Sequence, residues 1–132
     1  MAERTTPSIT GIRTVSVPVS DHERSLGFYR DALGFEVRLD AAFGPGMRWV
    51  ELAPAGAGTT IALAPPGDTR PGVDSGIRLG TEDATAEHQR LRSAGIDVDA
   101  DVMRLPGVPP MFSSRDPDGN RLYMVETQQT GN

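Results

Sequence analysis

Few side chains in this sequence could carry chemistry. There is no cysteine, which excludes thiol catalysis, disulfides and thiolate metal sites. The two histidines, His22 and His88, fall in separate helical patterns, and neither a His-x-His nor a His-Glu-x-x-His spacing occurs. We expect His22 to be a solvated or capping residue and His88 to be a half-buried packing or hydrogen-bonding residue. No Ser-His-Asp arrangement and no glycine-rich phosphate loop is present.

A second group of residues could bind a ligand instead. In a strand, successive side chains point to opposite faces, so apolar positions that pack on a helix leave the alternate positions for a concave face. Val50 and Leu52, for example, leave Trp49 and Glu51 on that face. Flat aromatic surface with a few polar groups is typical of a site for a partly aromatic compound. The predicted ligand-binding residues are Thr14, Ser16, Met47, Trp49, Glu51, Ala62, Arg78, Met103, Phe112, Ser114 and Tyr123.

Plainer interpretations of these residues stay open. Trp49 could fill the core or a subunit interface. Glu51 and Arg78 could form an internal ion pair, because buried charges need a partner. Tyr123 could hydrogen-bond across the concave face. Glu51 is also the one candidate for a catalytic residue, as a general base, with Arg78 or Tyr123 stabilising an oxyanion that develops on the substrate.

The elements that would position these residues occur twice. Residues 20–34 predict a helix with a Ser20/Glu23 capping box, a stripe of Leu26, Tyr29 and Leu33, and a terminal glycine. A second helix is predicted after the cap Asp83 and ends at a glycine 61 positions after the first. Strands are predicted at 14–19, 36–39, 47–52, 60–63, 76–79, 96–98, 111–114 and 121–125, with Met111 and Leu122 facing the core.

The order of these elements predicts an α+β fold built from two βαβββ modules. We expect one domain over residues 9–127, with module one at 9–66, a Pro- and Gly-rich linker at 65–74 and module two at 75–127. Residues 1–8 and 128–132 are expected to be flexible termini. Residues 116–120 (Asp-Pro-Asp-Gly-Asn) predict a tight turn before the last strand.

The ordered motifs resemble those of the vicinal-oxygen-chelate (VOC) superfamily of glyoxalase, bleomycin-resistance protein and extradiol dioxygenase relatives. They lie at residues 17–21, 24–26, 28–29, 33–35 and 116–120, and the resemblance covers residues 11–126. It implies that two curled sheets form a cup, with the helices outside, and that a second subunit often completes the cup.

The resemblance also implies where a divalent metal would bind. Metal-using members supply His, Gln or Glu ligands at positions that correspond here to Thr14, Ala62, Gly76 with its neighbour Ser75, and Tyr123. Divalent ions need carboxylate or imidazole donors, and these residues supply neither. We therefore expect no metal site and no cofactor.

Composition limits the partners. The net charge of −5 argues against nucleic acid and anionic membranes, which need a basic surface. No apolar stretch approaches a membrane span, and residues 1–8 lack the apolar core of a secretory signal. Without cysteine, a cytoplasmic location is the expectation.

The sequence thus favours a metal-independent small-molecule binding protein that sequesters an aromatic or apolar compound, such as an antibiotic, as a homodimer. The alternative is a glyoxalase-like lyase or isomerase, or a dioxygenase, that uses a metal or Glu51 as general base. A third possibility is a structural or regulatory dimer whose cup is filled by its own side chains.

Overall fold

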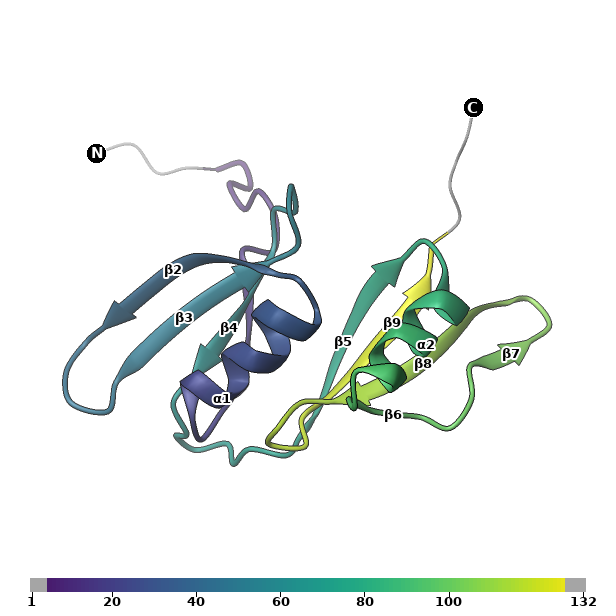
Figure 1. The fold of residues 1–132 in the computed structure, drawn as a ribbon. Coiled ribbons are helices and arrows are strands. Elements are labelled where there is room, and N and C mark those ends of the chain that lie inside the picture. The colour runs from purple at the N-terminus through teal and green to yellow at the C-terminus, as the bar shows by residue number, and fades with distance from the viewer. Residues whose placement is uncertain (1–4, 128–132) are drawn as a thin grey trace.

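The computed structural model describes residues 5–127. Residues 1–4 and 128–132, which belong to the predicted flexible termini, lie outside the described residues. The fold is α+β, and it contains two βαβββ units in tandem, each with a helical segment packed on one face of a sheet (Figure 1). Within residues 5–127, neither helical segment is long and apolar enough to cross a membrane.

The first sheet has the strand order β1-β4-β3-β2. Strands β1 and β4 run parallel, and the remaining neighbours are antiparallel. Strand β2 is longer than predicted because it forms a hairpin with β3 that continues to a glycine-containing turn. The strands are β1 (Thr14–Pro18), β2 (Glu36–Ala42), β3 (Arg48–Ala53) and β4 (Thr60–Ala64).

The second sheet repeats this arrangement with the order β5-β9-β8-β6. It adds a short strand, β7, that pairs with β8 and that the sequence did not predict. All three residues of β7 are exposed, so this strand contributes nothing to the core. The strands are β5 (Asp74–Thr81), β6 (Asp97–Val98), β7 (Met103–Leu105), β8 (Val108–Arg115) and β9 (Arg121–Glu126).

The first helical segment differs from the prediction at its start and in its pitch. It consists of a short α-helix, α1 (His22–Leu26), that continues as a π-helix, η1 (Gly27–Ala32). The N-cap is Asp21, whose side chain accepts from Arg24 N at 3.1 Å. The predicted Ser20/Glu23 capping box is wrong because the Ser20 hydroxyl donates to Asp118 instead, and Glu23 pairs with Arg48.

The second helix, α2 (Ala84–Ser93), begins at the predicted cap Asp83, which accepts from Ala86 N at 3.0 Å. Both helical segments are followed by a glycine in the left-handed region, Gly34 at φ +78° and Gly95 at φ +80°. A side chain is strained in that conformation, so glycine is favoured after each helix. The repeated glycines therefore mark the helix ends as the sequence predicted.

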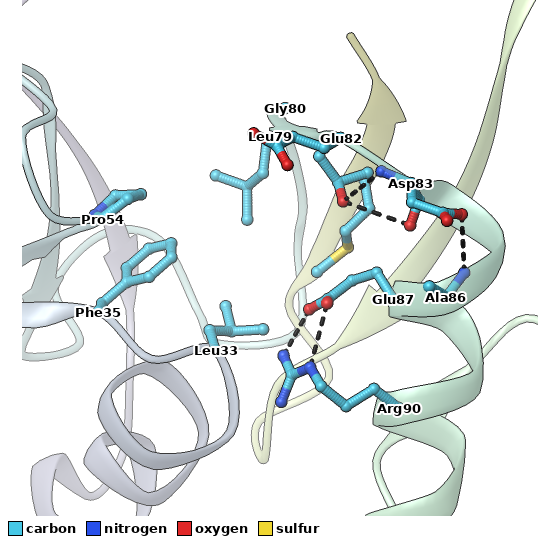
Figure 2. Close-up of a pocket in the computed structure, with 12 residues that line it drawn as sticks. Leu33, Phe35, Pro54, Leu79, Gly80, Glu82, Asp83, Ala86, Glu87 and Arg90 are labelled. Carbon is cyan, nitrogen blue, oxygen red and sulfur yellow. Dashed lines mark hydrogen bonds and ion pairs between the residues drawn. The ribbon is translucent and has the colours of Figure 1, made fainter.

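The two units meet on their helical side. Leu33, after η1, packs against both hydrophobic clusters, one centred on the first sheet and one under α2. Figure 2 shows Leu33, Phe35 and Pro54 facing Leu79 and α2 across an open cleft. The contact between units is thus incomplete at this point.

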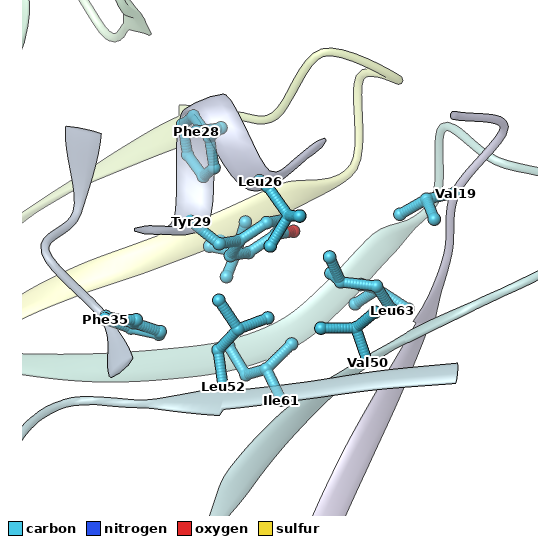
Figure 3. Packing of buried hydrophobic residues seen from close by; sticks show 11 residues of the cluster. Val19, Leu26, Phe28, Tyr29, Phe35, Val50, Leu52, Ile61 and Leu63 are labelled. Carbon is cyan, nitrogen blue, oxygen red and sulfur yellow. The ribbon is translucent and has the colours of Figure 1, made fainter. Parts of the chain in front are cut away.

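The larger hydrophobic cluster fills the space between η1 and the first sheet (Figure 3). Strand β1 contributes Val17, and β3 and β4 contribute alternate residues, as the period-2 pattern predicted. Leu26 and Tyr29 supply the helical stripe, which is also as predicted. The buried strand residues of this cluster are Val17, Val50, Leu52, Ile61, Leu63 and, from the second sheet, Leu122.

The predicted turn at residues 116–120 is held by a buried polar network. Asp116 accepts at Oδ2 from the Tyr29 hydroxyl at 2.7 Å and from Asn120 Nδ2 at 2.9 Å. Asn120 also donates to Pro18 O and accepts from the Gly72 and Val73 amides. One turn therefore ties together η1, the end of β1 and the linker between the units.

Candidate ligand-binding site

The face of the first sheet that lies away from η1 carries a compact set of predicted site residues. In the parallel pair β1–β4, Thr14 is in register with Thr60 and Ser16 with Ala62. In β3–β4, Glu51 is opposite Ala62. Because residues in register point to the same face, these side chains lie together, and Trp49 lies on the same face two residues before Glu51. The sequence placed this face correctly, since Val50 and Leu52 pack on the helical side.

Glu51 is the central polar group of this face. It is 4% exposed, and its carboxylate accepts three hydrogen bonds. Trp49 Nε1 donates to Oε2 at 2.9 Å, Arg13 Nη1 donates to Oε2 at 3.1 Å and Thr60 Oγ1 donates to Oε1 at 3.2 Å. The Trp49 hydrogen bond is the main cause that lowers the pKa of Glu51 from its usual range. The carboxylate is therefore ionised at neutral pH, and within residues 5–127 its Oε1 accepts a single hydrogen bond, which leaves one acceptor site there for a ligand.

The ion-pair partner of Glu51 is Arg13 and not Arg78, so the predicted Glu51–Arg78 pair is wrong. Arg13 immediately precedes β1, where strand alternation no longer fixes the side-chain direction. Its side chain is 75% exposed, and one guanidinium nitrogen, Nη1, contacts Glu51. No periodicity in the sequence could have found this contact.

The second sheet presents a smaller group. Arg78 and Tyr123 are in register, and the Arg78 guanidinium carbon lies 4.5 Å from the centre of the Tyr123 ring. The Tyr123 hydroxyl donates to Asp74 Oδ2 at 2.7 Å. This hydrogen bond is the main cause that lowers the pKa of Asp74. Tyr123 thus bonds within its own sheet, between β9 and β5.

Two predicted site residues of β8 lie on the helical face of the second sheet, so their predicted placement on the concave face is wrong. Phe112 is 2% exposed and packs under α2, with its ring edge-to-face against His88 at 5.1 Å. Ser114 is buried on the same side, and its hydroxyl donates to Asp97 O. Met111, predicted as core, lies on the opposite face. The predicted faces of β8 are shifted by one residue because adjacent Met111 and Phe112 are both apolar. The sequence pattern therefore does not decide which of them packs on the helix.

The corrected register puts Ser113 on the face of Tyr123, its antiparallel partner. Ser113 is held there by Asp99, which accepts from both its amide and its hydroxyl. Arg115, on the same strand as Ser113, donates hydrogen bonds to both Asp99 and Asp97. These residues form a charged edge of the second sheet rather than part of an apolar surface.

Apolar side chains extend from both sheets into solvent. Leu39 is in register with Glu51 and is exposed, which enlarges the apolar part of that face. Phe43 and the predicted site residue Met47 lie at the turn of the β2–β3 hairpin. Met103, also a predicted site residue, lies on β7. The exposed large hydrophobic residues of the two hairpins are Val37, Leu39, Phe43, Met47, Met103, Leu105 and Val108.

Within residues 5–127, no hydrogen bond or ion pair joins the Trp49–Glu51 group to the Arg78–Tyr123 group. The structure therefore brings together Thr14, Ser16, Trp49, Glu51 and Ala62 on one sheet, and separately Arg78 and Tyr123 on the other.

Both histidine side chains hydrogen-bond to backbone carbonyl oxygens on the helical side of the sheets. His22 Nε2 lies 2.9 Å from Leu63 O and His88 Nε2 lies 2.7 Å from Asp99 O. His88 is buried rather than half-buried, and it both packs against Phe112 and hydrogen-bonds to Asp99 O, as predicted. His22 is half-buried and bonded to a strand carbonyl, so the prediction of a solvated or capping residue is wrong.

The positions that hold metal ligands in VOC relatives do not fit a divalent ion here. Ala62 has no donor atom, and the Thr14 hydroxyl is bonded to Thr60. Gly76 sits at φ +71°, a conformation that a ligand side chain rarely adopts. The Tyr123 hydroxyl is bonded to Asp74. In the described part of the chain, no three His, Asp or Glu residues cluster as a metal group would require.

A sequence profile of the Glyoxalase/Bleomycin resistance protein/Dioxygenase superfamily matches residues 11–124. The chain belongs to this superfamily. The match begins before β1 and ends within β9, so it covers both βαβββ units.

Two solved structures and one further protein are similar to this chain over most of its length. TnmS3, an antibiotic binding protein from Streptomyces sp. CB03234, is 32% identical with a TM-score of 0.83, covering 93% of this chain and 100% of its own. A superfamily member from Sphaerobacter thermophilus DSM 20745 is 33% identical with a TM-score of 0.84, covering 90% and 98%. The uncharacterized protein YetH of Bacillus subtilis (strain 168) is 26% identical over 89% of this chain and 99% of its own.

Proposed function

We propose that this chain is a metal-independent binding protein that sequesters a partly aromatic small molecule on the helix-free face around Trp49 and Glu51. The observation that carries the proposal is the state of Glu51: a nearly buried carboxylate, oriented by three donors, beside an indole and the exposed Leu39. Such a group anchors a ligand that combines an apolar ring with one hydrogen-bond donor. The similarity to TnmS3 supports an antibiotic as one class of ligand.

The electrostatics of Glu51 favour binding over catalysis. A general base works best when its pKa lies near the operating pH. Hydrogen bonds from Trp49, Arg13 and Thr60 lower the pKa of Glu51, which makes it a weaker base. A carboxylate with most of its acceptor sites occupied can hold a ligand donor but is poorly suited to remove a proton from carbon.

A second copy of the chain would complete the site. Exposed Leu39, Phe43 and Met47 on one hairpin, and Met103 and Leu105 on the other, leave apolar surface at the edges of both sheets. Contiguous exposed apolar residues are typical of association surfaces. Pairing would also bring the Trp49–Glu51 group of one copy toward the Arg78–Tyr123 group of another, which a single chain leaves unconnected. We therefore propose a homodimer. The location proposed for it is the cytoplasm, with which a sequence without cysteine agrees.

The proposal is tested with a matched pair of probes. Titration with 4-nitrobenzyl alcohol and with 4-nitrotoluene should quench Trp49 emission, because both rings fit beside the indole. The alcohol should bind about tenfold more tightly, since only it can donate to the free acceptor site of Glu51 Oε1. The single tryptophan makes emission a local readout of this face.

Glu51→Gln should remove the preference for the alcohol, and Asp101→Asn, at an exposed carboxylate on the other unit, should preserve it. Equal binding of both probes by the native chain would contradict the assigned role of Glu51. Absence of quenching by either probe would contradict the binding face itself.

A further inference from the structure

A cavity lies on the helical side of the sheets, between the two units. Its volume is about 510 Å³, within the range of small-molecule sites, and such sites occur preferentially between structural units. Figure 2 shows its walls: Leu33, Phe35 and Pro54 from the first unit, and the β5–α2 connection with the first turns of α2 from the second. None of the predicted ligand-binding residues lines this cleft.

The floor of the cleft is apolar. Phe35 and Met124 are almost fully buried, and Leu33 and Leu79 are partly buried members of the two hydrophobic clusters. The cleft is thus the place where the two cores approach each other without closing. An apolar group that enters it would contact side chains already held by both cores, which reduces the entropy cost of ordering them.

The rim of the cleft on the α2 side is acidic. Glu82, Asp83 and Glu87 line it, and Arg90 is the single cationic residue in the lining. Arg90 is already paired with Glu87, with Nε 3.0 Å from Oε1. Asp83 accepts from Ala86 N as the helix cap. Glu82 is exposed and forms no ion pair within residues 5–127, so the rim has an excess of negative charge.

A related cleft elsewhere in the fold provides a comparison. The repeat of 61 residues relates Phe35 to Ile96 and Pro54 to Arg115, and these two line a cavity beside α1 and η1. There Arg115 is paired with Asp97, and Arg24 with Asp118. Two arginines thus balance the carboxylates of this second cleft, whereas the first cleft has one arginine against three carboxylates.

We propose that the cleft between Phe35 and α2 is a binding site for a small organic cation, with its apolar body on Phe35 and Met124 and its ammonium group beside Glu82 and Glu87. The site is separate from the Trp49–Glu51 face. It would let the protein hold an amine independently of the compound that the sheet face binds.

The probe is 2-phenylethylamine, which is cationic at neutral pH, and the matched control is phenylacetate. On the full chain, amide chemical-shift changes with the amine should centre on Gly80, Ala86 and Met124, and phenylacetate should cause none there. The double substitution Glu82→Gln and Glu87→Gln should weaken amine binding about tenfold. Asp101→Asn, which removes a carboxylate outside the cleft, should leave it unchanged.

A second variant tests the cavity rather than its charge. Ala86→Trp fills the cleft from an exposed helix position and should abolish amine binding with the rim carboxylates intact. Equal binding of amine and phenylacetate, or undiminished binding by Ala86→Trp, would overturn the proposal. Dissociation of a dimer by Ala86→Trp would also overturn it, because a second copy would then occupy the cleft. In every variant except Ala86→Trp, which adds a second tryptophan, Trp49 emission reports the other face, so failure of either site is seen separately.

Discussion

The Tyr29 hydroxyl donates a 2.7 Å hydrogen bond to Asp116 Oδ2, and this contact joins the helical segment of the first unit to the turn before the last strand of the second. Both side chains are buried. Burial is the main cause that raises the pKa of Tyr29 far above its usual range, with Asp116 adding to it, so the phenol stays protonated and donating. The Asp-Pro-Asp-Gly-Asn motif thus acts as a structural connection between the units.

Tyr29→Phe should lower the free energy of unfolding by about 2 kcal/mol, because a hydrogen bond to a buried carboxylate is lost. Urea denaturation measures the loss. Tyr123→Phe is the matched control, since its hydroxyl bonds to the exposed Asp74, and it should lower the free energy of unfolding clearly less than Tyr29→Phe. Equal losses for the two variants would contradict a special role of the Tyr29–Asp116 contact.

Asn120→Ala should be more damaging. The fully buried Asn120 side chain donates to Pro18 O and Asp116 and accepts from the Gly72 and Val73 amides, so truncation leaves several buried groups unpaired. We expect a loss of about 3–4 kcal/mol in urea denaturation. Gln89→Ala, on the exposed side of α2, should change stability by less than about 0.5 kcal/mol. A loss below 1 kcal/mol for Asn120→Ala would contradict this account.

The sequence predicted most of the fold because strong local signals coincide with the elements. The alternation around Val50 and Leu52 placed Trp49 and Glu51 on the correct face, and Gly34 and Gly95 marked the helix ends. The sequence could not supply the ion pair of Glu51 with Arg13, which depends on the path of the chain before β1. It also failed for Phe112, because two adjacent apolar residues leave the register to tertiary packing against His88.

Stability should depend on pH through Glu51. The folded-state pKa is lowered, chiefly by the Trp49 hydrogen bond, so the ionised carboxylate stabilises the fold above its unfolded-state pKa, which is about 4.3. This contribution is lost as the pH falls through the lower, folded-state value. The difference in unfolding free energy between the native chain and Glu51→Gln should be constant from pH 8 to 5 and shrink below about pH 4. A difference independent of pH down to pH 3 would contradict an ionised Glu51.

Phe112→Leu should separate packing from binding. Phe112 packs under α2 and away from Trp49, so the substitution should lower stability by about 1–2 kcal/mol and leave the affinity for 4-nitrobenzyl alcohol unchanged. Chemical denaturation and Trp49 quenching measure the two effects. A large loss of affinity with little change in stability would instead place the ring in the binding site.

The central claim is that the Trp49–Glu51 face binds its ligand without a metal ion. The direct test is the dissociation constant of 4-nitrobenzyl alcohol, measured by Trp49 quenching before and after exhaustive treatment with EDTA, with the metal content of both samples determined. The account predicts the same dissociation constant in both samples and no stoichiometric metal in either. Loss of binding after chelation, restored by a stoichiometric divalent ion, would contradict it.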